Sequence, residues 1–194
     1  MPRALDRWNL RAGVPAASGA GTPREASAFH DDFVRLFRAH SGRLFRYLDR
    51  LCGEPELAAD LVQDAFLRLY QRGSMPEQPG AWLITVAMNL FRNDRSTRAR
   101  RRRLLTPFRA ESSLSDPPPA PGEAVEQRES RNRVRAAVDR LSPRERHLLL
   151  LRAEGYAYRD IAHSLGLNEA SVGTLLARAK QAFREAYEES DAPR

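Results

Sequence analysis

The residues with the clearest recognition chemistry lie near the C-terminus, between residues 156 and 183. Ile161-Ala162 is followed by Gly166 and, six residues later, by Val172. Two helices that cross through a tight turn need a small residue at the crossing, a glycine that can adopt a left-handed conformation in the turn, and an apolar residue between the helices. This spacing predicts a helix-turn-helix, a motif whose second helix can enter a DNA major groove.

The second helix of this motif, predicted from about Glu169 to Tyr187, would turn one face toward DNA. Arg178 is the leading candidate for a base contact, because its planar guanidinium can donate two hydrogen bonds to guanine. A surface charge facing Asp or Glu is the alternative for Arg178, and an αα-corner without a ligand is the alternative for the motif. The candidate DNA contacts are Arg159, Ser171, Thr174, Ala177, Arg178 and Lys180.

A dense run of arginines forms a second candidate nucleic-acid surface. The chain has a net charge of +7, and the stretch from Arg95 to Arg109 contains seven arginines and no acidic residue. A run of one sign at the end of a helix favours contact with phosphate groups. A solvated helix face or a tail is the alternative interpretation.

The remaining residue types argue against several classes of protein. The four histidines, His30, His40, His147 and His163, lack the spacing of metal ligands, and no phosphate-cradling glycine loop follows a strand. We therefore expect no enzymatic activity, no metal and no cofactor. The single cysteine, Cys52, excludes a disulfide framework. With no apolar run near the roughly 18 residues of a membrane span, we expect a cytoplasmic protein without membrane insertion.

The elements that must position these residues have helical apolar spacing almost throughout. Apolar residues predict helices from Asp31 to Leu51, from Pro55 to Tyr70, and from Ala81 into the arginine run. Gly53 ends the first helix, and a loop rich in helix breakers covers residues 73–80. Three helices with short connections predict a compact bundle.

The composition then changes to proline, serine and acidic residues between Thr106 and Glu123, which predicts an extended linker. The helical pattern resumes near Ala124, and Ser142-Pro143-Arg144-Glu145 is a capping box that starts a new helix. The sequence therefore predicts an all-α protein: a three-helix N-terminal bundle and a C-terminal helix-turn-helix domain joined by a flexible linker. The predicted segments are a disordered tail (1–28), the N-terminal domain (29–104), a Pro-rich acidic linker (105–129) and the C-terminal domain (130–190).

Two separate sets of motifs resemble bacterial sigma factors of the extracytoplasmic-function type. The segment 60–70 is similar to their second conserved region, and Trp82-Leu83-Ile84-Thr85-Val86-Ala87-Met88-Asn89-Leu90-Phe91-Arg92-Asn93 to the adjoining promoter-melting region. The segments 142–146 and 158–179 resemble the C-terminal region of the same family. The resemblance covers about residues 29–103 and 130–187.

This resemblance implies roles for individual residues. Asn89 and Asn93 match asparagines that hold a base flipped from the downstream promoter element, together with the loop from Arg72 to Pro79. The arginines from Arg98 to Arg103 would hold the DNA backbone nearby. The implied downstream contacts are Arg72, Trp82, Asn89, Asn93, Arg98, Arg101 and Arg102, and the implied polymerase contacts are Asp60, Gln63, Asp64 and Phe66.

The implied function is that of a transcription-initiation factor that binds core RNA polymerase and directs promoter recognition and DNA melting. The C-terminal domain would recognise duplex promoter DNA upstream, and the N-terminal domain would capture the melted single strand downstream. The hypothesis for the free protein is that its domains are loosely tethered until polymerase fixes their spacing. The sequence leaves open the promoter, and whether an anti-sigma factor holds the protein silent.

The chain also departs from the family pattern. Gly173 and Leu175 stand where family members commonly carry basic residues, and Met88 stands where arginine is frequent. Each lost contact would weaken upstream binding by roughly 1–3 kcal/mol.

Two other functions remain as alternatives. A dimeric helix-turn-helix regulator binds operator DNA without polymerase, and its N-terminal half is commonly a sensor domain with a sheet. A helical adaptor would bind a protein partner and use the arginine run on RNA. Dimerisation on a palindromic site favours the regulator, whereas binding to core polymerase favours the sigma factor.

Overall fold

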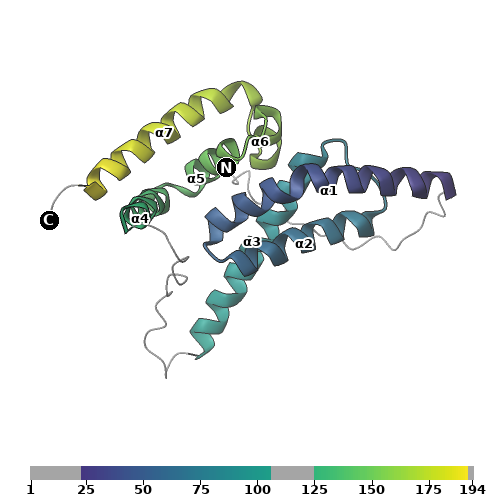
Figure 1. Cartoon of the computed structure of the whole chain (residues 1–194), viewed down its shortest axis with the longest axis horizontal. Helices are drawn as coiled ribbons and strands as arrows, with labels where there is room; N and C mark the ends of the chain where they lie inside the picture. The colour runs from purple at the N-terminus through teal and green to yellow at the C-terminus, as the bar shows by residue number, and fades with distance from the viewer. Residues whose placement is uncertain (1–22, 106–124, 192–194) are drawn as a thin grey trace, which may run out of the picture.

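The computed structural model describes residues 23–105 and 125–191, and within these ranges the chain forms helices and no strand. The all-α prediction is therefore confirmed. The described helices, labelled in Figure 1, are α1 (Pro23–Cys52), α2 (Pro55–Arg72), α3 (Pro79–Leu105), α4 (Val125–Arg140), α5 (Pro143–Ala153), α6 (Tyr158–Leu165) and α7 (Glu169–Asp191). Four of them begin at a proline, whose fixed φ suits the first helical position and whose missing N–H has no partner to lose there.

The N-terminal domain consists of α1, α2 and α3, with α2 packed on both other helices. Leu48 of α1, Leu69 of α2 and Ile84 of α3 are fully buried in its core. Gly53 has a φ of 72° and reverses the chain between α1 and α2. A side chain at Gly53 would also meet the guanidinium of Arg135, because the position of its Cβ lies 1.7 Å from Nη2 of that arginine.

The C-terminal domain consists of α4 to α7, and α7 packs on all three of the others. The predicted capping box is confirmed: the Ser142 hydroxyl accepts a hydrogen bond from the backbone N–H of Glu145, and the Glu145 carboxylate accepts one from the backbone N–H of Ser142. These two bonds satisfy backbone donors that a helix start leaves unpaired.

Two predicted boundaries are wrong by a few residues. Helix α1 begins at Pro23, so residues 23–28 are helical and not part of a disordered tail. Proline at the first helical position, followed by Glu25 in the first turn, is a favourable helix start. Helix α4 begins at Val125, inside the predicted linker of residues 105–129. The rest of the predicted tail and linker, residues 1–22 and 106–124, lie outside the described residues, as do residues 192–194.

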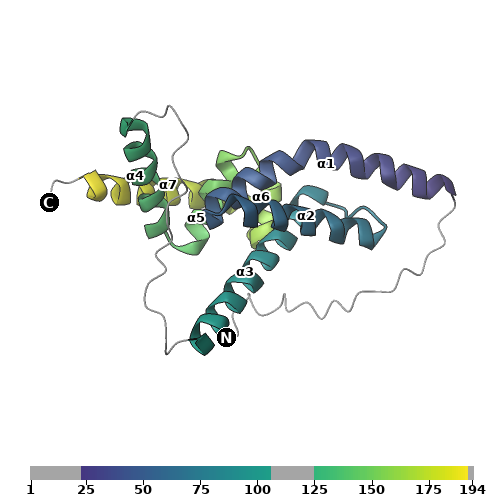
Figure 2. The same cartoon turned by 60° about the horizontal axis from the view of Figure 1, so that its bottom comes forward.

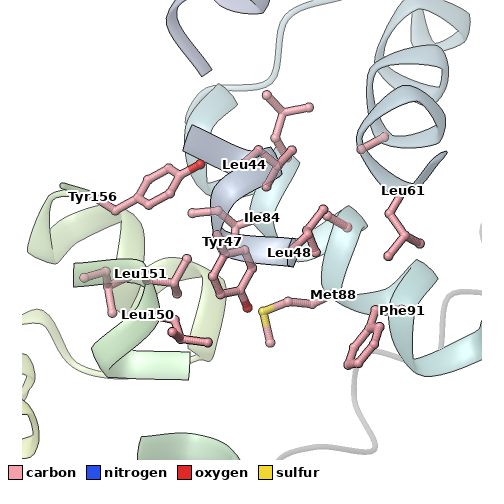
Figure 3. Packing of buried hydrophobic residues seen from close by; sticks show 14 of the residues in the cluster. Leu44, Tyr47, Leu48, Leu61, Ile84, Met88, Phe91, Leu150, Leu151 and Tyr156 are labelled. Atoms are coloured by element: carbon pink, nitrogen blue, oxygen red, sulfur yellow. The ribbon is translucent and has the colours of Figure 1, made fainter. Parts of the chain in front are cut away.

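The two domains pack against each other, contrary to the hypothesis of loose tethering. Helix α5 lies on α1, and α6 lies on α3. Figure 3 shows Tyr47 of α1 with Leu150 and Leu151 of α5 on one side and Met88 of α3 on the other. The buried residues of both domains consequently form one continuous hydrophobic cluster.

The C-terminal half of α3 projects away from this packed body, as Figures 1 and 2 both show. Among the described residues, no helix is both long and apolar enough to cross a membrane.

Candidate functional site

The helix-turn-helix predicted from the sequence is present in α6 and α7. Gly166 ends α6 with a φ of 62° and a ψ of 42°, the left-handed conformation that the turn requires. Val172 is fully buried between the helices, beside Ile161 and Ala162. The small side chain of Ala162 permits the close crossing that places α7 across α6.

One face of α7 is exposed over its first three turns. Ser171, Thr174, Ala177 and Arg178 are exposed on that face, as predicted, and Arg159 is exposed on α6. Lys180 is also exposed, but at about 100° per residue it lies roughly 120° around the helix from Thr174. Gln181 was missed by the sequence analysis, although its position seven residues after Thr174 places it on the same face.

The glycine within α7 lies beside an aromatic ring. The position that a Cβ of Gly173 would take is 3.7 Å from Cε2 of Tyr158, the first residue of α6. The Tyr158 side chain is 41% exposed, and the guanidinium carbon of Arg152 lies 5.4 Å from the centre of its ring. Tyr158 and Arg152 thus form a surface next to the exposed face of α7, where Gly173 contributes no side chain.

A polar stripe runs along α3. Residues at spacings of three, four and seven share one helix face, and this stripe comprises Trp82, Asn89, Asn93, Ser96, Thr97 and Arg100. Asn93 and Arg100, with Ser96 and Thr97 between them, line a shallow hollow of about 210 Å³. The stripe therefore offers amide, hydroxyl and guanidinium groups along the part of α3 that projects from the body. Ser96, Thr97 and Arg100 were not singled out from the sequence, although helical spacing from Asn89 would have identified them.

Arg98 does not lie on this stripe. Its guanidinium pairs with Glu54 at 2.8 Å and with Asp94 at 2.8 Å on the opposite side of α3. The hydrogen bond to Glu54 and these neighbouring carboxylates raise its pKa above the usual value for arginine. The prediction that Arg98 contacts DNA is therefore wrong for this conformation. Arg72 is exposed in the last turn of α2, whereas the side chains of Arg101 and Arg102, both in α3, lie outside the described residues.

Helix α2 presents an acidic and polar face to solvent. Asp60, Gln63 and Asp64 are exposed on it, but Phe66 is only 3% exposed. The Phe66 ring packs edge-on against Phe37, with ring centres 4.9 Å apart, and against Phe33 at 6.0 Å. Phe66 is therefore a core residue and not a direct partner contact. The exposed apolar residues near it are Phe37, Leu67 and Tyr70, which the sequence analysis missed.

No group of three or more potential metal-binding side chains occurs within residues 23–105 and 125–191. The features that remain are two recognition surfaces for nucleic acid, on α7 and on α3, and one candidate protein-binding face, on α2.

Comparison with known proteins matches both domains. Residues 36–102 match the family described as sigma-70 region 2, and residues 131–183 match sigma-70, region 4. The ECF RNA polymerase sigma factor SigL of Mycobacterium tuberculosis is 30% identical over 168 residues, which cover 79% of this chain and 88% of SigL. The chain belongs to the ECF sigma factors. Region 2 of this sigma factor thus corresponds to most of α1 with α2 and α3, and region 4 to most of α4 with α5, α6 and most of α7.

Two further similarities agree with this family. The ECF RNA polymerase sigma factor BldN of Streptomyces coelicolor is 30% identical over 154 residues, or 77% of this chain. This sigma factor spans 58% of the length of BldN, about three fifths. The solved structure of the sigma factor RpoE in complex with the anti-sigma factor NepR, from Bartonella quintana, has a TM-score of 0.60 at 23% identity. It covers 81% of this chain and 98% of the RpoE chain, and it supports the fold assignment.

Proposed function

We propose that this ECF sigma factor binds core RNA polymerase and directs it to promoters, where it recognises duplex DNA upstream and captures a melted strand downstream. The observation that carries the proposal is the presence, in one chain, of an exposed helix-turn-helix face and a separate amide, hydroxyl and arginine stripe on α3. The role is one of recognition in the cytoplasm, without enzymatic activity of its own.

Upstream recognition is assigned to α7. Thr174 and Arg178 lie on its exposed face, where Arg178 can donate two hydrogen bonds to a guanine in the major groove. The absence of a side chain at Gly173 is offset by Tyr158, whose exposed ring occupies the adjoining surface with Arg152. These two residues are proposed to contact the DNA backbone at the edge of the recognition surface.

Downstream capture is assigned to the stripe on α3. Asn89 and Asn93 provide paired amides that can recognise the hydrogen-bonding edge of an unstacked base, and Trp82 supplies an aromatic ring on the same face. Ser96, Thr97 and Arg100 continue the stripe as contacts for the phosphates of the single strand. Arg98 is excluded from this role because Glu54 and Asp94 already neutralise it.

Polymerase binding is assigned to the exposed face of α2, through Asp60, Gln63 and Asp64, with Phe66 supporting this face from the core. RpoE of Bartonella quintana was solved in complex with an anti-sigma factor. We extend the same class of partner to this chain as a regulator. The dimeric regulator is disfavoured because the N-terminal half matches region 2 and contains no strand over residues 23–105.

The deciding experiment is co-elution of the purified chain with sigma-free core polymerase, followed by run-off transcription on genomic fragments. A stable complex that starts transcripts at discrete sites supports the sigma-factor function. A chain that ignores polymerase but binds DNA as a dimer supports the regulator. Within the complex, replacing Asn89 and Asn93 together with Ala should abolish open-complex formation while preserving polymerase binding.

A further inference from the structure

The contact between the two domains is centred on a buried carboxylate. Glu154, at the end of α5, is the one charged residue in the buried class among those that the structure describes, and its side chain is 3% exposed. Its Oε2 accepts a hydrogen bond from Nε of Arg46 at 2.7 Å, and its Oε1 accepts one from Nη1 of Arg50. Both arginines belong to α1 of the N-terminal domain. A carboxylate removed from water needs such partners, so Glu154 depends on the other domain for its stabilisation.

A second polar contact lies one turn away on each helix. The Tyr47 hydroxyl is 2.7 Å from Nδ1 of His147, and the Tyr47 side chain is fully buried. Burial raises the pKa of Tyr47 and lowers the pKa of His147 to about 4, so both side chains are neutral near pH 7. The other charged groups that act on His147 are Arg92 of α3 and Arg146 of α5.

The domain interface nevertheless remains polar and incompletely paired. The Tyr156 hydroxyl and Nδ1 of His40 are buried without a hydrogen-bond partner among the described protein atoms. Two of its main polar partners, Arg46 and Arg50, keep about half of their side-chain surface in solvent. Interfaces of this kind between domains separate more readily than an apolar core does.

This closed arrangement holds the two recognition surfaces close together. Helix α6 packs on α3 on one side and on α7 on the other, and packed helices lie about 8–10 Å apart, so one helix separates the two DNA-binding helices. Arg92, which borders Asn93, is close enough to affect the pKa of His147 in α5. Even two neighbouring sites on one face of duplex DNA are about 34 Å apart. The closed chain therefore cannot place α7 in an upstream major groove and α3 on a separate downstream strand at once.

We propose that Glu154 with Arg46 and Arg50, and Tyr47 with His147, form a latch that keeps the free sigma factor closed, and that polymerase docks on α2 before this latch opens. The order follows from the packing: α2 packs on α1 and α3, and its Asp60, Gln63 and Asp64 remain exposed in the closed arrangement. This inference rests on the proposed function for the identity of the docking partner. The existence of the latch itself is independent of that partner.

The first test measures the separation of the domains in the full-length chain without polymerase. Spin labels at Q71C and E188C, in a C52S background, report the distance between α2 and α7, since both positions are exposed. We expect one short distance in the parent chain and a population at longer distances in E154Q, which keeps the size of the side chain and removes its charge. E189Q is the matched control, because Glu189 pairs with Arg140 inside the C-terminal domain at 3.3 Å. An E154Q distribution identical to that of the parent overturns the latch.

The second test locks the arrangement. R50C and E154C, joined by a short cleavable dithiol crosslinker in the C52S background, hold α1 against α5. The locked chain should still associate with core polymerase through α2 but give no open complexes, and cleavage of the crosslink should restore them. E154Q should bind polymerase at least about tenfold more tightly than the parent, because less of it occupies the closed state. Open complexes formed at the normal rate by the locked chain would contradict the proposal.

The two tests also separate the latch from the proposed function. If the distances change in E154Q but neither chain binds polymerase, the latch stands and the sigma-factor function fails. If polymerase binding and promoter opening are normal while the distances and the locked chain show no effect, the function stands and the latch is refuted.

Discussion

The Tyr47 hydroxyl and the Nδ1 atom of His147 lie 2.7 Å apart, although 100 residues separate them in the sequence. The contact joins α1 of region 2 to α5 of region 4. Because burial and the nearby Arg92 and Arg146 lower the pKa of His147 to about 4, its neutral form accepts a hydrogen bond from the Tyr47 hydroxyl. The packing of the two domains is thus coupled to the protonation state of one imidazole.

This coupling predicts that acid opens the domain contact. Above about pH 6.5, His147 is neutral in both the closed and the open states and pH has no effect through it. Between pH 6.5 and 4, the solvent-exposed imidazole of the open state binds a proton that the closed state excludes, which disfavours the closed state by up to about 3 kcal/mol. The distance between labelled domains, measured from pH 7.5 to 4.5, should therefore increase as the pH falls.

H147Q should flatten this pH profile, and H163Q, at an exposed histidine of α6, should leave it unchanged. His40 also has a lowered pKa, from burial and then Arg43, with Asp160 acting in the opposite direction. H40Q should accordingly reduce the pH effect without removing it. A profile that is the same in H147Q as in the parent would show that His147 is not the responsible group.

Replacing Gly173 with alanine should stabilise the chain. Its added Cβ would lie 3.7 Å from Cε2 of Tyr158, an ordinary contact distance, and alanine favours helix over glycine by about 1 kcal/mol. Gly166→Ala is the matched contrast, because a φ of 62° disfavours any residue with a Cβ, by roughly 1–2 kcal/mol. Thermal unfolding should show a rise in Tm for the first variant and a fall for the second; a fall for both would mean that α7 is strained at residue 173.

Ser142→Ala should lower the free energy of unfolding by about 1 kcal/mol, because it removes the hydroxyl that accepts from the Glu145 N–H. The bond from the Ser142 N–H to the Glu145 carboxylate remains in this variant. Urea unfolding compares it with Ser171→Ala, at an exposed position of α7 that makes no cap. Equal stability of the two variants would show that the capping box contributes nothing.

The helix-turn-helix and the capping box could be predicted from the sequence because each depends on residues close together in the chain. Gly166, Val172 and Ser142 act within one or two turns, and the structure places them as their spacing indicates. The start of α1 was missed because no apolar stripe marks residues 23–28, although Pro23 and Glu25 are favourable helix-starting residues.

The domain contact could not be predicted, because its determinants are distant in sequence and ordinary in composition. Glu154 resembles any surface acid at the end of a helix until α1 brings Arg46 and Arg50 beside it. Arg98 illustrates the same limit in reverse: within an arginine run it resembles a phosphate contact, but Glu54, 44 residues earlier, pairs with it. Charge runs identify a surface, whereas tertiary packing decides which members of the run remain available.

The face of α2 provides a final prediction that separates binding from folding. Asp64 is exposed, so Asp64→Arg should leave stability within about 0.5 kcal/mol while reversing the charge presented to polymerase. Phe66 is 3% exposed and packs on Phe37 and Phe33, so Phe66→Ala should lower the free energy of unfolding by about 3–5 kcal/mol.

Chemical denaturation and polymerase co-elution, measured on both variants, give opposite patterns under this assignment. Asp64→Arg should lose co-elution at unchanged stability, and Phe66→Ala should lose stability first and binding only in proportion to its unfolded fraction. Glu77→Arg, an equal charge reversal in the exposed loop before α3, is the control for a non-specific effect of net charge. Retention of polymerase binding by Asp64→Arg would remove the acidic face of α2 from the interface and direct attention to the neighbouring apolar residues Phe37, Leu67 and Tyr70.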